Sequence, residues 1–91
     1  MEYGKYIIVR SSGFEVAIVF SPLIEHSYFS CLSNNKIISA GFFRVEADFD
    51  KILIAFSIKV TVFGESISLH LKPRKEDALL IAKILNPTQG N

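Results

Sequence analysis

The chain has 91 residues, and this length predicts a single domain, because two halves would each be too small to hold a hydrophobic core. Hydrophobic residues make up 49% of it and charged residues 21%, and the net charge of +1 argues against a strong polyelectrolyte partner. No run approaches the roughly 20 continuous apolar residues that a bilayer-spanning helix needs, so no membrane association is expected.

Two short strands are predicted at the start of the chain, over residues 6–9 and 14–20, with a tight loop at Ser12-Gly13. This loop would set an opposite-charge pair and two β-branched pairs across the strands, a combination that favours the hairpin: Arg10–Glu15, Val9–Val16 and Ile7–Ile18. The following segment, residues 22–32, fits either a short helix or a structured loop, and a turn signal at 33–35 follows it.

A third strand is predicted over residues 36–46 and a fourth over 51–62, joined by a four-residue loop at 47–50. This loop fixes the register of the two strands, with the pairs Val45–Ile52 and Gly41–Phe56. A glycine inside a strand often marks close approach by another group, here the Phe56 ring, or else a bulge.

The fourth strand has a regular pattern, with six large apolar side chains at alternate positions: Ile52, Ile54, Phe56, Ile58, Val60 and Val62. Period-two spacing puts them all on one face of a strand. The alternation returns after Gly64-Glu65, where glycine at the first loop position suits a type II′ hairpin turn, and it continues at Ile67, Leu69 and Leu71. We therefore predict a fifth strand that pairs with the fourth.

A helix is predicted from Pro73 to about Leu85, because proline suits the first helical position and a wide apolar arc follows it. Asn86-Pro87 would end the helix, and a single domain over residues 1–87 would leave 88–91 as a frayed tail. The predicted fold is α+β: a five-stranded antiparallel sheet in ββ-(loop or short helix)-βββ-α order, with the C-terminal helix packed on one face. That inner face would carry Val9, Val16, Ile18, Phe43 and Ile81, among others.

The opposite face of the predicted sheet is also apolar, although half-solvated antiparallel sheets usually carry polar residues on the wet side. One helix covers one face, so the second face is predicted to contact a second copy of the chain, as a homodimer, or another protein. Cover by the 22–32 segment, a ligand cavity and a wrong strand register are the alternatives. The predicted interface residues are Tyr6, Ile8, Val19, Ile38, Phe42, Leu53 and Phe63.

Titratable and nucleophilic residues do not form a recognisable catalytic or metal-binding pattern. A zinc site needs four converging ligands, and the chain offers His26, His70 and Cys31 before carboxylates are counted. No oriented third group can be placed beside a cysteine–histidine pair, so we expect a non-enzymatic protein without metal or cofactor. As the only cysteine, Cys31 allows no internal disulfide, which fits a cytoplasmic location.

Basic residues gather where the predicted fifth strand meets the helix, and they predict an alternative function. Backbone N–H groups at a helix start can hold a phosphate or carboxylate, and neighbouring cations would add to the attraction. The candidate residues for binding an anionic ligand or nucleic acid are Lys59, His70, Lys72, Arg74 and Lys75. The net charge of +1 and the lack of exposed aromatics beyond Phe63 argue against nucleic acid as the main partner.

Two segments resemble motifs in small uncharacterised bacterial and prophage-type proteins. They are Ser39-Ala40-Gly41-Phe42 (SAGF) and the stretch from Gly64 to Ala78, which contains the form GxSxSLxLxxR. The resemblance covers roughly residues 5–85 and implies no catalytic residue. It implies a bacterial or phage-encoded accessory protein that acts by binding, with Ser39, Gly41, Gly64 and Arg74 as signature positions.

Overall fold

The computed structural model describes residues 3–31 and 36–85 and has an α+β fold. Four strands form one antiparallel sheet in the order β2-β1-β3-β4: β1 (Tyr3–Ser11), β2 (Phe14–Phe20), β3 (Lys36–Asp50) and β4 (Ala55–Phe63). A 3-10 helix, η1 (His26–Cys31), lies between β2 and β3 in the chain, and helix α1 (Asp77–Leu85) follows β4. The predicted class is confirmed, with four strands in place of five.

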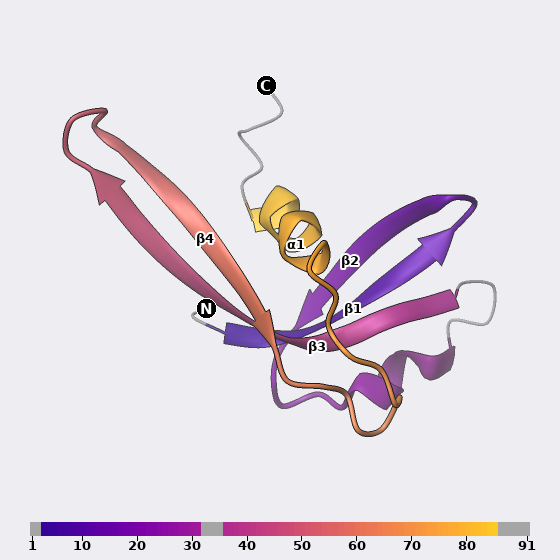
Figure 1. The fold of residues 1–91 in the computed structure, drawn as a ribbon. Helices are drawn as coiled ribbons and strands as arrows, with labels where there is room; N and C mark the ends of the chain where they lie inside the picture. Colours follow the sequence, from indigo (N-terminus) through magenta and orange to yellow (C-terminus); the bar gives the residue numbers. More distant parts are fainter. Residues whose placement is uncertain (1–2, 32–35, 86–91) are drawn as a thin grey trace.

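The sheet is strongly curled, and the two hairpins diverge from a common base. Figure 1 shows β1–β2 extending to one side and the far part of β3–β4 extending to the other, with α1 lying between them. Helix α1 contacts β2 and β4, which are the two edge strands of the sheet. Because the helix bridges both edges, the concave side of the sheet is covered at its centre.

The first hairpin has the predicted register. Ser12 and Gly13 both take positive φ, at 52° and 84°, as a tight two-residue hairpin turn requires. The strands then pair as predicted, and the Arg10–Glu15 pair forms a salt bridge of 2.7 Å. Turn chemistry and cross-strand pairing therefore agree at this end of the sheet.

The second hairpin turns later than predicted. Strand β3 continues through the expected loop to Asp50, the turn falls at residues 51–54, and Val45 pairs with Val60. The partner of Val45 is thus eight positions further along than predicted. An even shift of this kind leaves the same side chains on the same face, so the alternating pattern fits both registers.

The predicted fifth strand does not form within the described residues. After β4, Gly64 takes a φ of 70°, and the chain then makes a short turn closed by an isolated bridge between Ser66 and Leu71. A Cβ atom at Gly64 would lie 2.8 Å from the Phe42 ring, so the chain passes directly over that ring as it leaves β4. Leu69 and Leu71 of this segment pack back onto the sheet without extending it, whereas Ile67 remains exposed.

Helix α1 packs on a face, called the helix face here, that combines the predicted open face of β1 and β2 with the predicted inner face of β3 and β4. Tyr6 and Ile8 are fully buried there with Ala17, Phe43 and Ile81, and Val19 and Ile38 are partly buried against them. A register shift between β1 and β3 at Ile8/Val9 changes which residues share a face. The predicted inner face, which combined Val9 and Ile18 with Phe43, is therefore wrong.

The second face is covered by other parts of the same chain. Its core consists of Ile7, Val9, Phe20 and Ala40, and it is packed by Phe29 of η1 and by the 66–71 turn through Leu69 and Leu71. The 22–32 segment thus contains a short 3-10 helix that covers part of this face, which was one of the alternatives left open. The predicted turn at 33–35, helix stop at 86–87 and tail at 88–91 lie outside the described residues. No helix within the described residues is long and apolar enough to cross a membrane.

Candidate functional site

The outer part of the β3–β4 hairpin, residues 46–59, extends away from the body of the protein and is called the arm here (Figure 1). Both of its strands remain paired to the last residues before the turn, Asp50 and Ala55. Helix α1 sits near its base and not at its end (Figure 1). The turn at its end is therefore held out in solvent by a continuous two-stranded ladder.

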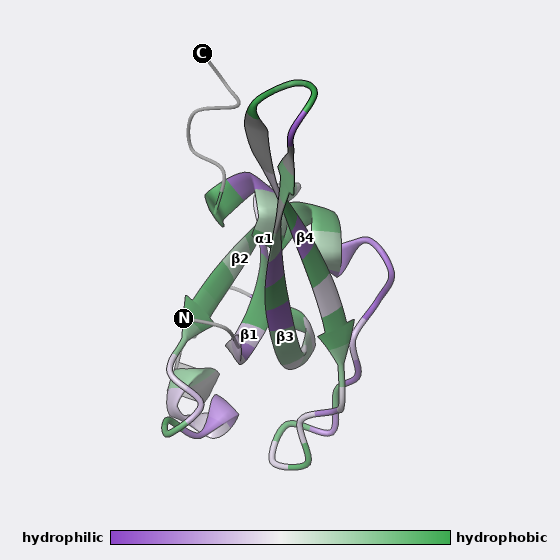
Figure 2. Ribbon diagram, turned by 90° about the vertical axis from the view of Figure 1, so that its left-hand side faces the viewer, coloured by the Kyte–Doolittle hydropathy of each residue, from purple (hydrophilic) through white to green (hydrophobic). Residues whose placement is uncertain are grey.

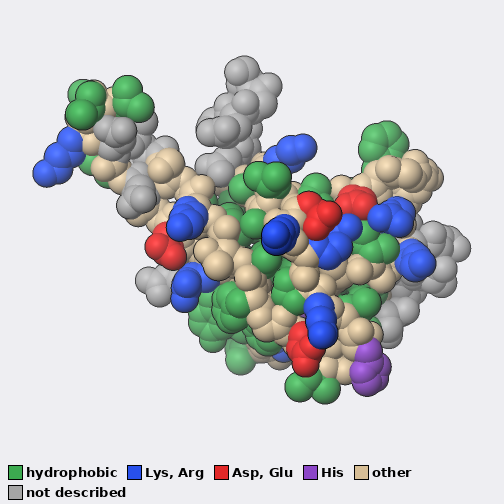
Figure 3. Space-filling model, viewed as in Figure 1, with side chains coloured by type: hydrophobic (Ala, Val, Ile, Leu, Met, Phe, Trp, Pro, Cys, Tyr) green, Lys and Arg blue, Asp and Glu red, His purple; other side chains and the backbone are tan. Residues whose placement is uncertain are grey.

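The arm tip, defined as residues 49–54, carries four exposed apolar side chains beside the charged residues Asp50 and Lys51. Ile52 is 90% exposed, Ile54 79%, Leu53 73% and Phe49 48%. Figure 2 colours most of this turn as hydrophobic, and Figure 3 shows hydrophobic side chains gathered at the same end of the molecule. Turns of hairpins are usually built from Gly, Asn, Asp and other polar residues, so this composition is unusual.

Ile54 also adopts an unfavourable backbone conformation, with a φ of 50°. A β-branched residue rarely takes positive φ, and the left-handed region costs an L-residue about 1–2 kcal/mol. The tip thus combines an unfavourable backbone angle with several exposed aliphatic side chains. Features of this kind stabilise an isolated chain poorly and are concentrated at functional surfaces.

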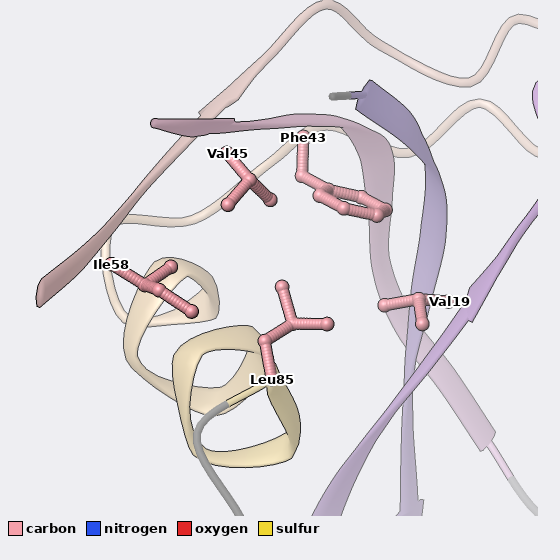
Figure 4. A pocket seen from close by; sticks show the side chains of 5 residues that line it. All are labelled: Val19, Phe43, Val45, Ile58 and Leu85. Carbon is pink, nitrogen blue, oxygen red and sulfur yellow. The ribbon is translucent and has the colours of Figure 1, made fainter. Parts of the chain in front are cut away.

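An apolar pocket lies at the base of the arm, on the helix face. Its volume is about 310 Å³. Figure 4 shows its lining side chains, which come from β2, β3, β4 and α1 and converge on one space: Val19, Phe43, Val45, Ile58 and Leu85. All five are aliphatic or aromatic, so the pocket suits an apolar occupant without charged groups.

The seven predicted interface residues do not share one open surface. Tyr6 and Ile8 are fully buried beneath α1, and Val19 and Ile38 pack beside them. Phe42 lies on the second face, stacked on Phe63 with the ring centroids 5.8 Å apart. Exposed area remains on Phe63, at 43%, and on Leu53, which lies in the arm tip and not in a sheet face.

A buried polar network joins the helix start to the first hairpin. The Tyr6 hydroxyl donates to Asp77 Oδ2 at 2.7 Å, and the Arg74 backbone N–H and Nε donate to the same carboxylate at 2.9 Å. Arg74 also pairs with Glu15 at 2.9 Å, and Glu15 pairs with Arg10. The Asp77 contact to the Arg74 N–H is the reciprocal half of a capping box, so it fixes where the helix begins.

This network has the properties of a structural contact. Asp77 is fully buried, and donors from Tyr6 and Arg74 occupy its oxygens. Burial, followed by the hydrogen bond to Asp77, raises the pKa of Tyr6 far above its usual range, so its hydroxyl stays protonated. The Arg74 and Arg10 guanidiniums lower the pKa of Glu15 to about 2. Neither arrangement leaves a solvent-facing nucleophile or base for a substrate.

The predicted anion-binding residues lie on the arm, in the 67–70 turn and around the start of α1. Arg74, the residue at the helix start, is engaged by Glu15 and Asp77. Lys59 lies on the arm opposite Glu46, and His70 lies in the 67–70 turn with a φ of 57°. Lys72 and Lys75 are exposed on either side of Arg74. Across residues 3–31 and 36–85, no group of three or more His, Cys, Asp or Glu side chains could hold a metal ion.

Comparison with protein-family models, curated proteins and solved structures finds no match to this chain. The molecule is thus defined by its own features: an α+β fold with a four-stranded curled sheet, an apolar arm tip and an apolar pocket at the arm base. The sequence contained the signal for the tip, since Lys51 is followed by Ile52, Leu53 and Ile54, but the predicted register assigned these residues to a strand.

Proposed function

We propose that this protein is a non-enzymatic interaction module that self-associates through the apolar arm tip. The observation that carries the proposal is the exposure of Ile52, Leu53 and Ile54 at the end of a paired β-hairpin. The two faces of the sheet are packed by α1, by η1 and by the 66–71 turn, so the contact surface is the arm and not a sheet face.

The size of the apolar contribution favours a contact in which both copies bury their tips. Burying one aliphatic side chain contributes roughly 1.5–3 kcal/mol, so three of them contribute about 4–9 kcal/mol. Association costs about 4–15 kcal/mol in lost translational and rotational freedom. Burying one tip would therefore barely offset the cost of association. Burying two tips in a symmetric dimer would exceed that cost over most of its range.

The biological setting is part of the same proposal. Its support is the sequence resemblance to small bacterial and prophage-type proteins, which favours an accessory or regulatory protein encoded by a bacterium or phage. A single cysteine in 91 residues, and hence no internal disulfide, is consistent with a reducing cytoplasm. The anion-binding alternative lacks comparable support, because the carboxylates of Glu15 and Asp77 already neutralise Arg74.

Sedimentation over a range of concentrations tests the proposal with a matched pair of variants. The wild type should show a monomer–dimer equilibrium, and Leu53→Glu should raise the dissociation constant at least about tenfold, because one buried aliphatic side chain is lost and a charge is placed in the contact. The control is Leu23→Glu, which changes a residue that is 94% exposed outside the arm and should leave the equilibrium unchanged.

Two results would refute self-association through the tip. One is a wild-type protein that stays monomeric at the highest accessible concentration. The other is a dimer whose dissociation constant is the same for Leu53→Glu and for Leu23→Glu.

A further inference from the structure

We infer that the occupant of the pocket at the arm base is the arm tip of a second copy, so that two chains exchange arms about a two-fold axis. This inference rests on the proposed self-association and specifies where the tip binds. It assigns two of the three tip side chains Ile52, Leu53 and Ile54, with Leu53 as one of the two, to the space lined by Val19, Phe43, Val45, Ile58 and Leu85.

The tip cannot reach the pocket of its own chain. Ile58 in the pocket wall and Ile54 in the tip belong to the same hairpin, four residues apart, and the β3–β4 ladder continues to the Asp50–Ala55 pair. A strand rises about 3.3 Å per residue, which places the tip roughly 13 Å beyond the pocket wall. Folding the tip back would require breaking the ladder, so an occupant from the tip must come from another molecule.

A two-fold axis satisfies both contacts at once. The distance from tip to pocket is the same in the two copies, because each copy has an arm of identical length. When two arms lie side by side and antiparallel, each tip therefore arrives at the pocket of the other chain. The interface is isologous and closes at two copies, so it forms a dimer and not a filament.

The pocket and the tip also match in chemistry and size. The pocket is apolar on all its lining residues, and its volume of about 310 Å³ is roughly twice that of an engineered cavity of about 150 Å³ that holds benzene. Two branched aliphatic side chains fit such a space. Residues 86–91, which follow Leu85, contain a single proline among glycine and polar residues and offer no large apolar group to fill it.

Cysteine cross-linking between two differently tagged chains tests this arrangement, in a Cys31→Ser background that removes the only native thiol. One chain carries Leu53→Cys in the tip, and the other carries Leu85→Cys in the pocket. A short bismaleimide should join them at a yield roughly tenfold or more above the control, because the dimer holds the two thiols at millimolar effective concentration. The control pairs Leu53→Cys with Leu23→Cys, which lies outside the arm.

Ile58→Cys gives a second pocket position in case Leu85→Cys perturbs the fold, and far-UV circular dichroism checks each variant. The inference is overturned if the protein dimerises in a tip-dependent way but Leu53→Cys links mainly to Leu53→Cys of another chain, which indicates tip-to-tip contact. It is also overturned if neither pocket position exceeds the control. Both results would overturn the exchange of arms and leave the proposed self-association unaffected. A wild type that stays monomeric in sedimentation would refute the self-association as well.

Discussion

The Tyr6 hydroxyl donates a hydrogen bond of 2.7 Å to Asp77 Oδ2, and these two residues lie 71 positions apart in the chain. Both are fully buried. Tyr6 belongs to the central strand β1 and Asp77 begins α1, so the contact ties the C-terminal helix to the middle of the sheet. Because α1 also forms one wall of the pocket, this contact positions Leu85 relative to the arm base.

Tyr6→Phe is expected to destabilise the protein by about 1.5–3 kcal/mol, because a hydrogen bond to a buried carboxylate is lost while the ring remains. Urea unfolding measures the change in the free energy of unfolding. Tyr3→Phe is the matched control, since Tyr3 is 51% exposed and should tolerate the same change within about 0.5 kcal/mol. Equal effects at the two tyrosines would show that the Asp77 contact contributes little.

Acid should weaken the ion pairs of Glu15 in a defined pH range. Hydrogen bonds from Arg74 and Arg10 lower its pKa from 4.5 to about 2 in the folded state. A lowered carboxyl pKa stabilises the fold above the unfolded pKa, and that contribution is lost as the pH falls from about 4.5 towards 2. The difference in unfolding free energy between wild type and Glu15→Gln should therefore shrink across this range. A difference that stays constant from pH 6 to pH 2 would contradict the assignment.

The first hairpin could be predicted from the sequence because its determinants are local. Ser12-Gly13 supplies two residues that accept positive φ, and Arg10 and Glu15 carry opposite charges across the turn. The 3-10 helix and its packing under Phe20 depend on contacts between segments, so the sequence left residues 22–32 open between helix and loop.

The second hairpin could not be placed from its pattern. Alternation sets which side chains share a face, but it does not set where the strand turns, and the pairs Val45–Ile52 and Val45–Val60 satisfy it equally. The turn that forms contains no Gly, Asn or Pro and includes Ile54 at positive φ. Its sequence therefore lacks the usual turn signal, and the arm tip was assigned to a strand.

The buried network was also beyond sequence reasoning. Asp77 lies in the first turn of α1, where the helix dipole alone would account for an acidic residue. The contact of Asp77 with Tyr6 depends on how the helix packs on the sheet. The predicted faces put Tyr6 on the side of the sheet away from the helix. Close approach at Gly41 was one of the two explanations that the sequence left open, and the approaching group is Pro73 and not Phe56.

Gly41→Ala should destabilise the protein, because an added Cβ would lie 2.6 Å from Pro73 Cγ and 3.1 Å from the Phe63 carbonyl oxygen. Overpacking of this kind costs about 1–3 kcal/mol. The double variant Gly41→Ala/Pro73→Ala removes the proline ring, so the two changes should couple by at least about 0.5 kcal/mol in a double-mutant cycle. Strictly additive effects would mean that the strand and the segment before α1 adjust independently.

Two buried serines should respond to alanine in opposite directions. Within the described residues, the Ser39 hydroxyl has no hydrogen-bond partner, although Ser39 is fully buried. Removing an unsatisfied buried hydroxyl avoids a desolvation penalty of about 1–3 kcal/mol, so Ser39→Ala should raise the free energy of unfolding. The Ser66 hydroxyl accepts from the Leu69 N–H at 3.2 Å, so Ser66→Ala should lower it by about 1 kcal/mol.

Thermal and urea unfolding of the two alanine variants measure this contrast directly. Both serines are almost completely buried, at 0% and 1% exposure, so a difference in burial cannot account for opposite signs. Loss of stability in Ser39→Ala comparable to that in Ser66→Ala would imply that the Ser39 hydroxyl has a partner such as a bound water. Both variants lose the same hydroxyl oxygen, so the change in side-chain volume is the same. Opposite signs would therefore show that the hydrogen bonding of the hydroxyl decides the change in unfolding free energy.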